Sequence, residues 1–580
     1  MSTGTSLRRV RLTPVRTVPV EFTGERAGEG PLTLSQLNIY LWLSQAPDRF
    51  YALLCAELPV PPVVSVDDVA EAVAALIARH ESLRTSFVGG EQPRQRVAAA
   101  GVQLLEVCSL GEGQWGPQDR PAVAEALIRW LRESPDPGQR PVRMAVAIAG
   151  DRVIACAAAF SHLAVDHSAI EILKRDFAGL LGDPARRQLG QVTHQPLDQA
   201  ALEATPAERG RADAALDYLR EQFRRIPRCL YALPGAQTAG QSVAVELSSV
   251  AASMAVRQVA ARTRASRSSV VLAAICAVVA RRANYRELVF RLLSSNRFER
   301  HLVNYVGSLA QTTIATVEIA GRSFDELASH TWTAVMAASR HGRFDEAKRA
   351  AVDELAEHER GLRVAYGPLF NSLVPERWSG LTAGVGFRPE PVDVALARTE
   401  LRWRPMPVSA LPLRFTLSQV DACLRLDAWS GDAGLLPRAE LESVLLAVER
   451  LLAAAADSDV SGHRMPGLIG LEPLAGASHR ILVDHCWVDI ADVQRLVDDA
   501  VAPAVARVFA SAGDRPLVAC LTATDDIRTP EQAHARCMAA LARHPTAITP
   551  RHYVICRTAP PDPADPAAWP PPLATGTGRD

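Results

Sequence analysis

The sequence predicts an α/β (α+β) protein in which mixed sheets are backed by helices, and three observations support this fold class. Residues 141–160 form two extended apolar segments separated by Gly150 and Asp151. Residues 168–181 have apolar side chains three and four positions apart, which is the period of an amphipathic helix. The same change from strand-like to helix-like periodicity recurs in the second half of the chain. With 580 residues, we expect several domains rather than one core.

The first part of the chain predicts an arm followed by a lobe. Residues 1–30 are polar, contain glycines and lack a hydrophobic period, so we expect a flexible N-terminal arm. Residues 31–197 form the expected first lobe. Within it, Ser65 is expected to cap a helix that begins near Val66, with Asp68 as the acid of the capping box.

A charged stretch precedes the expected second lobe. Residues 198–240 combine arginine-rich helical and Pro-Gly segments, so we interpret them as the connection between lobes. Such helices usually present a solvated face, and the alternative is a docking surface for an acidic carrier protein. The second lobe is expected over 241–456. Its predicted elements are a strand over 242–247, a helix over 256–283, a strand-like segment over 413–426 and a closing helix over 437–455.

The C-terminal part alternates between helix and strand. Within 467–558 we predict helices over 489–508 and 529–543 and strands over 516–522 and 551–558. Residues 559–580 are rich in proline, so we expect a disordered tail.

Composition excludes several classes of function. A net charge of −1 gives no bulk attraction to nucleic acid or to anionic membranes. The longest apolar run, 270–280, is too short for a membrane span, which needs about 20 residues. Residues 1–22 lack the apolar core of a secretory signal. The ten cysteines show neither a CxxC pair nor metal-ligand spacing, so we expect a cytoplasmic protein without a metal. No phosphate-binding loop of the GxxxxGK[ST] type occurs.

The most informative segment is the sequence SHLAVDH over residues 161–167. It places His162 and Asp166 four positions apart at a strand-to-helix corner, which suits acid/base chemistry. In a chain with 14 histidines, a single histidine beside an apolar strand is more often structural. A Ser161–His162–Asp166 triad is disfavoured because neighbouring residues of a strand point to opposite faces.

Three further segments fit one known pattern together with this motif. They are PLTLSQ at 31–36 followed by YLWL at 40–43, RHESLRTSF at 79–87, and NR at 296–297 followed by VGSL at 306–309 and TT at 312–313. In order and separation they resemble the condensation-domain superfamily of nonribosomal peptide synthetases, over residues 31–456. This resemblance implies two chloramphenicol-acetyltransferase-like lobes arranged as a V-shaped pseudo-dimer.

The resemblance also assigns roles to residues. His162 corresponds to the second histidine of the family motif HHxxxDG, which meets the substrates in a tunnel between the lobes, as a base or a positioning residue. Asp166 corresponds to the structural carboxylate that pairs with a distant arginine, for which Arg297 is the candidate. Tyr366 begins a segment, 366–370, that borders the tunnel in relatives.

The motif departs from the family pattern at two positions. Ser161 stands where the first histidine is usual, as in fungal cyclising relatives. His167 replaces the glycine, which tolerates left-handed backbone angles that cost other residues roughly 1 to 2 kcal/mol. We therefore expect either a different turn or a tunnel narrowed by the added imidazole.

The implied function is that of a freestanding condensation enzyme in natural-product (antibiotic) biosynthesis. It would transfer an acyl or aminoacyl thioester from a peptidyl or acyl carrier protein to a small-molecule amine or alcohol. The phosphopantetheine arm belongs to the carrier protein, and we expect no bound cofactor. The alternative is a degenerate, non-catalytic member that recruits a partner protein.

Residues 467–558 weakly resemble the small C-terminal subdomain of adenylate-forming enzymes. The similarity is in TPRHY at 549–553, which is like the entry to a strand of that subdomain. The Gly-Lys turn whose lysine contacts the adenylate is missing. We interpret this region as a non-catalytic appendage with docking as its candidate role.

Overall fold

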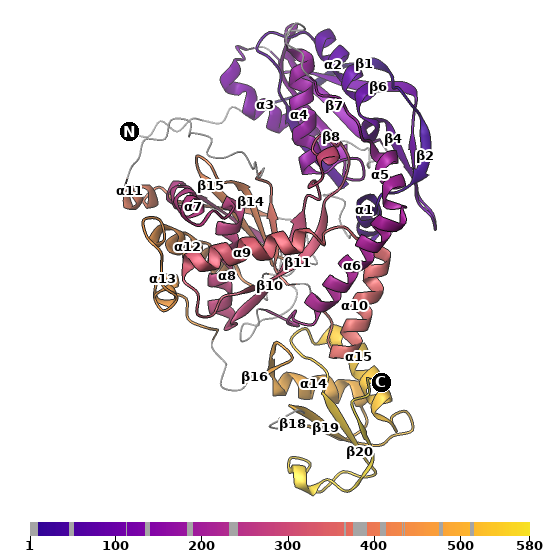
Figure 1. Cartoon of the computed structure of the whole chain (residues 1–580), viewed down its shortest axis with the longest axis vertical. Coiled ribbons are helices and arrows are strands. Elements are labelled where there is room, and N and C mark those ends of the chain that lie inside the picture. The colour runs from indigo at the N-terminus through magenta and orange to yellow at the C-terminus, as the bar shows by residue number, and fades with distance from the viewer. Residues whose placement is uncertain are drawn as a thin grey trace. The chain divides into compact units, whose positions relative to one another are not determined.

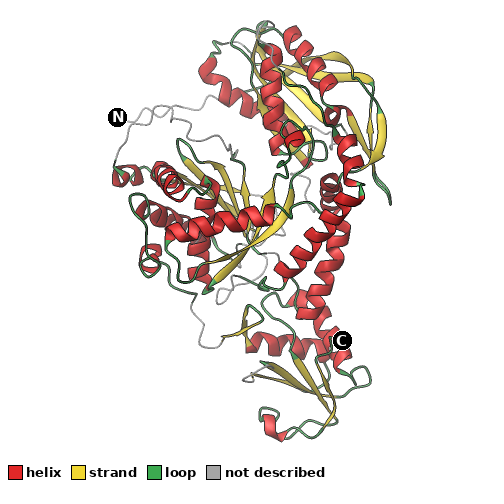
Figure 2. Ribbon diagram, viewed as in Figure 1, coloured by secondary structure: helices red, strands yellow, loops and turns green. Residues whose placement is uncertain are grey.

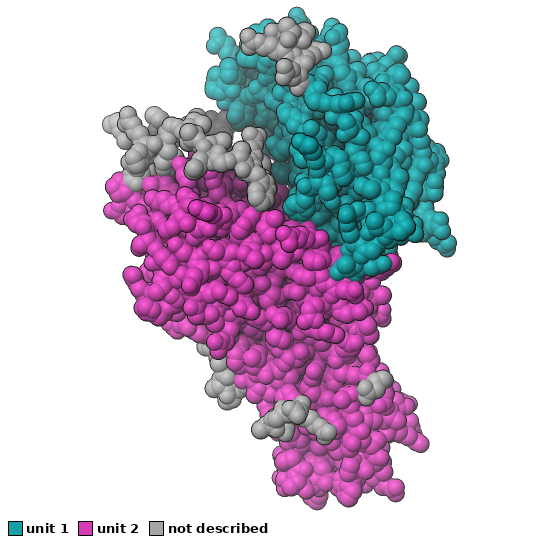
Figure 3. Space-filling view, in the orientation of Figure 1, with its two compact units in different colours: residues 1–214, 294–311, 342–346 teal, residues 215–293, 312–341, 347–580 magenta. Residues whose placement is uncertain are grey.

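The computed structural model consists of mixed sheets backed by helices, which confirms the predicted α/β (α+β) fold class (Figures 1 and 2). The chain forms two compact units (Figure 3). The first contains residues 1–214, 294–311 and 342–346, and the second contains 215–293, 312–341 and 347–580. The structure describes residues 10–45, 52–111, 113–133, 140–182, 189–230, 242–364, 367–374, 391–405, 413–431, 433, 436–474, 480–510 and 516–579.

A five-stranded sheet in the order β1-β6-β7-β8-β3 forms the centre of the first unit. Strands β6 and β7 are parallel, and the other neighbours pair antiparallel. The strands are β1 (Thr13–Thr23), β3 (Leu53–Leu58), β6 (Ala100–Ser109), β7 (Val142–Ala149) and β8 (Arg152–Ser161). The predicted break at Gly150 is confirmed as the turn between β7 and β8.

Helices cover both faces of this sheet, which explains why β8 is apolar at almost every position. Cys156, Ala158 and Phe160 pack in one cluster with α2 (Val66–Arg79) and α4 (His167–Leu181). The intervening alanines of β8 pack in a second cluster with α3 (Arg120–Glu133). Because both faces are buried, β8 holds the residues that follow it in a fixed place.

Helix α2 begins as the sequence predicts. Ser65 is its N-cap, and Ser65 and Asp68 form the expected capping box. A second, three-stranded sheet in the first unit has the order β2-β5-β4. Its strands are β2 (Gly28–Pro31), β4 (Thr85–Val88) and β5 (Arg94–Val97), and helices α1 (Leu34–Gln45) and α5 (Pro196–Glu203) belong to the same unit.

The expectation of a flexible arm over residues 1–30 is wrong for the part that the structure describes. Residues 13–23 form β1, which pairs with β6, and residues 28–31 form β2. Val20 is buried in the core, and Val18 and Phe22 pack against it. This alternation gives β1 an apolar face, and its position at the edge of the sheet tolerates Pro14 and Pro19.

The second unit contains a seven-stranded sheet in the order β11-β10-β12-β14-β15-β9-β13. Its strands are β9 (Val243–Ser249), β10 (Glu287–Ser294), β11 (Gln311–Glu318), β12 (Leu369–Ser372), β13 (Glu400–Pro405), β14 (Leu413–Gln419) and β15 (Leu424–Ser430). The main helices packed with it are α7 (Val250–Thr263), α8 (Arg267–Ala283), α9 (Phe324–Ser339) and α12 (Arg438–Ala454). The remaining described helices of this region are α6 (Pro206–Phe223), α10 (Glu346–Arg360), α11 (Val392–Leu396) and α13 (Met465–Ile469).

The single helix predicted over 256–283 is two helices. Arg264, with a φ of 60°, ends α7 in a left-handed conformation, and Ser266 caps α8. Among the described residues, no single helix is long and apolar enough to cross a membrane; α7 and α8 pass that test only as a pair, bent by 105°. The predicted segment 413–426 is likewise a hairpin of β14 and β15.

The C-terminal residues form a small α/β module within the second unit. It begins with a hairpin of β16 (Arg480–Val483) and β17 (Cys486–Asp489), followed by α14 (Ile490–Val501) and α15 (Pro530–Ala540). Its sheet has the order β18-β19-β20-β21. The strands are β18 (Ala506–Ala510), β19 (Leu517–Thr522), β20 (His552–Cys556) and β21 (Pro572–Gly576).

Two predictions for this module are wrong. The helix expected over 489–508 ends at Val501, and residues 506–510 form β18 instead. The tail expected to be disordered forms β21, which pairs antiparallel with β20. The edge of β20 that faces away from β19 is open to pairing with residues 572–576. Because β21 is an edge strand, it tolerates proline, so the proline-rich composition did not prevent pairing.

Candidate active site

The end of β8 fixes the backbone of His162. The His162 N–H donates to the carbonyl of Ala52 (2.9 Å). The N–H groups of Ala164 and Val165 both donate to the carbonyl of Ser161 (2.9 and 3.1 Å), which closes a tight turn directly after the strand. The imidazole is therefore carried by a turn whose backbone groups are hydrogen-bonded.

One nitrogen of the His162 ring has a defined protonation state. Nδ1 lies 3.0 Å from the carbonyl oxygen of Val165. A carbonyl oxygen can only accept, so Nδ1 carries the hydrogen, and in the neutral ring the lone pair is on Nε2. Within the described part of the chain, Nε2 has no hydrogen-bond partner. The free lone pair of Nε2 can accept a proton from a bound nucleophile.

Burial keeps this ring neutral. Loss of water around the half-buried side chain lowers the pKa of His162, and this effect outweighs the raising influence of the Val165 carbonyl and of Asp166. The unprotonated form therefore predominates at neutral pH, as a general base requires.

An aromatic side chain of the first unit lies beside His162. The indole of Trp42, on α1, is 6.2 Å from the imidazole between ring centroids, and the two planes are at 81°. This is an edge-to-face arrangement within the usual range for aromatic pairs.

Asp166 serves the fold at the same corner. It is the N-cap of α4, and its Oδ1 accepts the N–H of Ala169 (2.9 Å). Its Oδ2 accepts from Arg297 Nη1 (2.7 Å) and from the N–H groups of Leu309 (2.9 Å) and Ala310 (3.1 Å). The carboxylate thus connects the start of α4 to residues 294–311, which come from the second half of the sequence.

These donors stabilise a buried charge. Burial by itself would raise the pKa of Asp166, but the charge and hydrogen bond of Arg297 and the N–H groups of Leu309 and Ala169 bring it below its ordinary value. Arg297 is also held by carbonyls, since its Nη2 donates to Gly307 (2.9 Å) and its Nη1 to Ser295 (3.2 Å). Arg297, proposed from the sequence as the partner of Asp166, lies in that position.

Other polar contacts hold residues 294–311 in place. Asn296, in a left-handed conformation with a φ of 53°, donates to the carbonyls of Leu309 (2.9 Å) and Gly342 (2.7 Å). Ser35 and Ser82 donate to the carbonyls of Ala310 and Val306 (both 2.9 Å). Both serines belong to sequence motifs quoted above, so these motifs act in packing.

The structure describes both residues at which the motif departs from the family pattern, Ser161 and His167. Ser161 is buried, and no hydrogen bond joins its side chain to His162 in the described part of the chain, which gives no support to a serine triad. His167 is the exposed first residue of α4, so its backbone is helical rather than left-handed. The expected backbone cost of losing the glycine is therefore absent. Tyr366 lies outside the described residues.

Two other candidate regions are structural. His80 is fully buried and its Nε2 is 3.0 Å from Asp176 Oδ2, while Arg84 donates to the carbonyl of Arg26 (2.7 Å). Both side chains therefore pack within the first unit. Along and after α6, arginines pair with carboxylates, which favours the solvated face over a docking surface. The pairs are Arg211–Glu208, Arg220–Asp217, Arg224–Glu221 and Arg225–Glu287.

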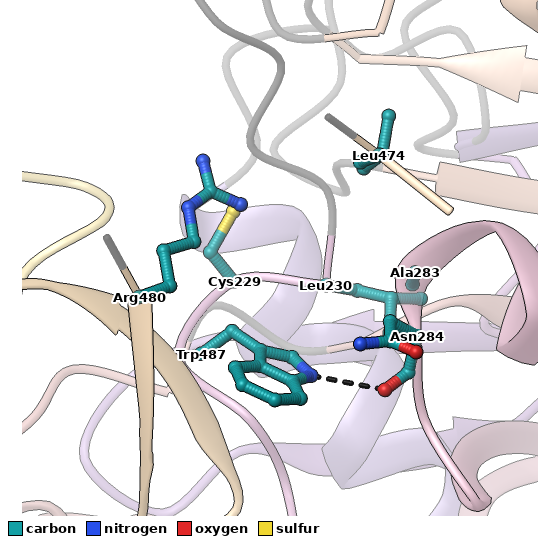
Figure 4. A pocket seen from close by; sticks show the side chains of 7 residues that line it. All are labelled: Cys229, Leu230, Ala283, Asn284, Leu474, Arg480 and Trp487. Atoms are coloured by element: carbon teal, nitrogen blue, oxygen red, sulfur yellow. Dashed lines mark hydrogen bonds between the residues drawn. The ribbon is translucent and has the colours of Figure 1, made fainter. Parts of the chain in front are cut away.

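Two pockets lie elsewhere. One of about 20 Å³ in the second unit is lined by Trp487, whose Nε1 donates to the carbonyl of Asn284 (3.0 Å; Figure 4). The other, of about 820 Å³, lies beside the turn at Gly150, at the opposite end of β8 from His162. Among the described residues, no three His, Cys, Asp or Glu side chains gather in a way that could hold a metal ion.

Comparison with known proteins gives one matching family. The model of the condensation domain matches residues 27–348. A curated relative, phosphinothricin tripeptide synthetase PhsC from Streptomyces viridochromogenes, is 29% identical over 364 residues, which are 59% of this chain and 32% of that protein. The chain thus spans about a third of the length of this relative.

Solved structures show the same fold. A structure from the enacyloxin polyketide synthase, concerned with condensation domain-mediated chain release, has a TM-score of 0.57 and 22% identity over 75% of this chain and 84% of that chain. SgcC5 from Streptomyces globisporus has a TM-score of 0.56 and 17% identity, and the match covers 74% of this chain and 100% of that chain. The first condensation domain of the calcium-dependent antibiotic synthetase has a TM-score of 0.53 and 19% identity, and the match covers 75% of this chain and 98% of that chain. The fold is chloramphenicol-acetyltransferase-like, as expected.

Proposed function

Because the chain belongs to the condensation-domain family, we propose that it is an acyltransferase that joins a thioester-activated acyl or aminoacyl group to an amine or alcohol. The donor is carried on the phosphopantetheine arm of a carrier protein, and the acceptor is a small molecule. The protein would act in the nonribosomal biosynthesis of a natural product.

The proposed reaction uses only one side chain as a proton carrier. The nitrogen or oxygen of the acceptor attacks the thioester carbonyl carbon, and Nε2 of His162 takes the proton that the acceptor loses. The carbon–sulfur bond then breaks, and the proton passes from the imidazole to the departing thiolate. A base in this position is worth roughly 10² to 10⁴ in rate.

The observation that carries this proposal is the state of the His162 ring. Its Nδ1–H is held by the carbonyl of Val165, its pKa is lowered by burial, and its Nε2 has no partner among the described residues. A histidine kept only for packing would have no need of an unpartnered, unprotonated nitrogen. The same geometry serves a positioning role, in which Nε2 accepts the hydrogen bond of the acceptor.

The test is product formation by wild type and His162→Ala. Purified protein is mixed with an acyl thioester on a carrier protein or on a short pantetheine mimic, together with a panel of amines and alcohols, and products are measured by mass. We expect the variant to lose roughly 10²- to 10⁴-fold in rate. His463→Ala, which removes an exposed histidine of the second unit, serves as the matched control and retains the wild-type rate.

Two outcomes contradict the proposal. Equal rates for wild type and His162→Ala would remove His162 from catalysis. No product with any donor and acceptor, together with binding of a partner protein that is unaffected by His162→Ala, would favour the non-catalytic recruiting domain.

A further inference from the structure

We propose that Trp42 is a positioning residue for His162: its indole fixes the orientation of the imidazole and keeps water away from it. This inference rests on the proposed role of His162 as the proton acceptor. Trp42 belongs to a quoted sequence motif, but nothing in its pattern distinguishes it from a core residue of α1.

The contact between the two rings leaves the imidazole little freedom. The hydrogen bond from Nδ1 to Val165 fixes one edge of the ring, and the indole of Trp42 lies at 81° to it with centroids 6.2 Å apart. A hydrogen bond alone permits rotation of the ring about the bond direction. A second contact with a flat, rigid side chain restricts that rotation, so Nε2 keeps one direction.

Helix α1 is a firm support for this contact. Thr33 and Gln36 hydrogen-bond to each other's backbone N–H at the start of the helix (3.2 and 2.9 Å), and Gln36 Nε2 donates to Gln95 (3.1 Å). Ser35, seven residues before Trp42 and hence on the same helix face, donates to the carbonyl of Ala310. The face of α1 that carries Trp42 is thus tied to the segment that binds Asp166.

The exposure of Trp42 does not fit a purely structural role. Its side chain is 40% exposed, and it is the one tryptophan among the exposed large hydrophobic residues of the described chain. A tryptophan used only to fill a core would be buried. Exposed indole surface beside a catalytic nitrogen instead gives an apolar wall next to the reacting groups.

The inference predicts a change in the titration of His162. The ring contacts Trp42 on α1 and the Val165 carbonyl just before α4, and Asp166 at the cap of α4 is the charged group that acts on it. Asp166 and the Val165 carbonyl both favour the protonated ring, and loss of water opposes it. Removing the indole readmits water, so the pKa of His162 rises.

The experiment compares Trp42→Ala, Trp42→Phe and Trp130→Ala with wild type. Trp130 is a half-buried tryptophan of α3 in the same unit, so its removal is a matched loss of side chain. The His162 proton resonance, identified by its loss in His162→Ala, is titrated by NMR. We expect Trp42→Ala to raise the pKa by about one unit, Trp42→Phe to change it less, and Trp130→Ala to leave it unchanged. Thermal melting verifies that each variant is folded.

Activity provides a second, separable readout. In Trp42→Ala, the acidic limb of the kcat profile moves to higher pH and kcat falls about tenfold or more, while KM changes less. An unchanged His162 titration in folded Trp42→Ala would overturn the inference even if His162→Ala is inactive. If the pKa of His162 rises in Trp42→Ala but the wild-type protein transfers no acyl group, the inference about Trp42 is supported and the proposed function is contradicted.

Discussion

At the scale of single residues, Asp166 shows how a charge is kept inside the first unit. Four donors converge on its two oxygens, one from α4 and three from residues 294–311. Removing one partner of such a buried arrangement leaves the other charge without compensation, which usually costs more than the pair contributes. Arg297 and three backbone N–H groups, those of Ala169, Leu309 and Ala310, would then lose this acceptor.

Asp166→Ala should therefore lower the free energy of unfolding by about 3 to 5 kcal/mol, as measured by urea denaturation. Asp421→Ala removes an exposed carboxylate that pairs with Arg267 and should cost less than about 1 kcal/mol. Since the pKa of Asp166 is lowered in the folded state, its contribution is present above the unfolded-state value of about 3.9. It is lost as the pH falls through the folded pKa, so the difference between wild type and variant should shrink in strong acid. Equal stability of the two proteins at neutral pH would contradict this role.

The sequence pointed to part of this site. Spacing placed His162 and Asp166 at one corner, and the resemblance named Arg297. Trp42 and the N–H groups of Leu309 and Ala310 were not identified as site groups. Every residue except proline has a backbone N–H, so the sequence does not mark which of these groups bind Asp166. The direction of the Trp42 indole depends on how α1 packs in three dimensions, which the local sequence does not show either.

At the scale of elements, the start of α4 answers the question raised by His167. The residue occupies the first helical position after the cap Asp166, and its side chain is exposed. A helical backbone gains nothing from glycine, which is about 0.5 to 1 kcal/mol less favourable there than ordinary residues.

His167→Gly should consequently destabilise the protein slightly, by no more than about 1 kcal/mol, and leave the rate and acceptor range unchanged. Thermal melting and the acyl-transfer assay with the full acceptor panel measure both effects. A broader acceptor range or a faster rate in this variant would restore the idea that the imidazole narrows the substrate passage.

Capping and turn residues predicted the helices and strands well where the pattern of buried residues points to the same element. The capping box at Ser65 and the turn at Gly150 gave α2, β7 and β8 nearly to the residue. The errors arose where pairing decides the structure. The proline-containing strands β1 and β21 are held by a neighbouring strand, and α7 ends at Arg264, a residue type with no preference for the left-handed conformation.

At the scale of the whole molecule, the division into units does not follow the order of the sequence. Residues 294–311 and 342–346 belong to the first unit although they lie within the predicted second lobe. Asp166, Ser35 and Ser82 show why, since these polar groups of the first unit bind this segment. A boundary chosen from composition cannot identify a segment that is held by such long-range hydrogen bonds.

The C-terminal module is joined to the rest of the second unit by buried arginines. Arg360, at the end of α10, donates from Nε to Asp484 Oδ2 and from Nη2 to the Asp484 carbonyl (both 2.9 Å). Its Nη1 donates to the carbonyls of Phe223 and Ile226. Arg228 donates to the carbonyl of Leu541 in the module (2.9 Å). The sequence-based interpretation of this region as a non-catalytic appendage did not predict these contacts.

Arg360→Ala should release the module, because it removes one donor from the Asp484 carboxylate and one from each of three carbonyls, in a site where the arginine is only 5% exposed. We expect the opening free energy of residues 480–579 to fall by about 3 to 5 kcal/mol, measured by hydrogen exchange on the full chain. Arg363→Ala removes a half-exposed arginine three residues away that pairs with Glu357, and should cost less than about 1 kcal/mol. If exchange in the module is the same in Arg360→Ala and Arg363→Ala, other contacts hold it. If exchange rises throughout both units instead, the module and the lobe unfold together, and Arg360 stabilises the fold as a whole rather than this junction.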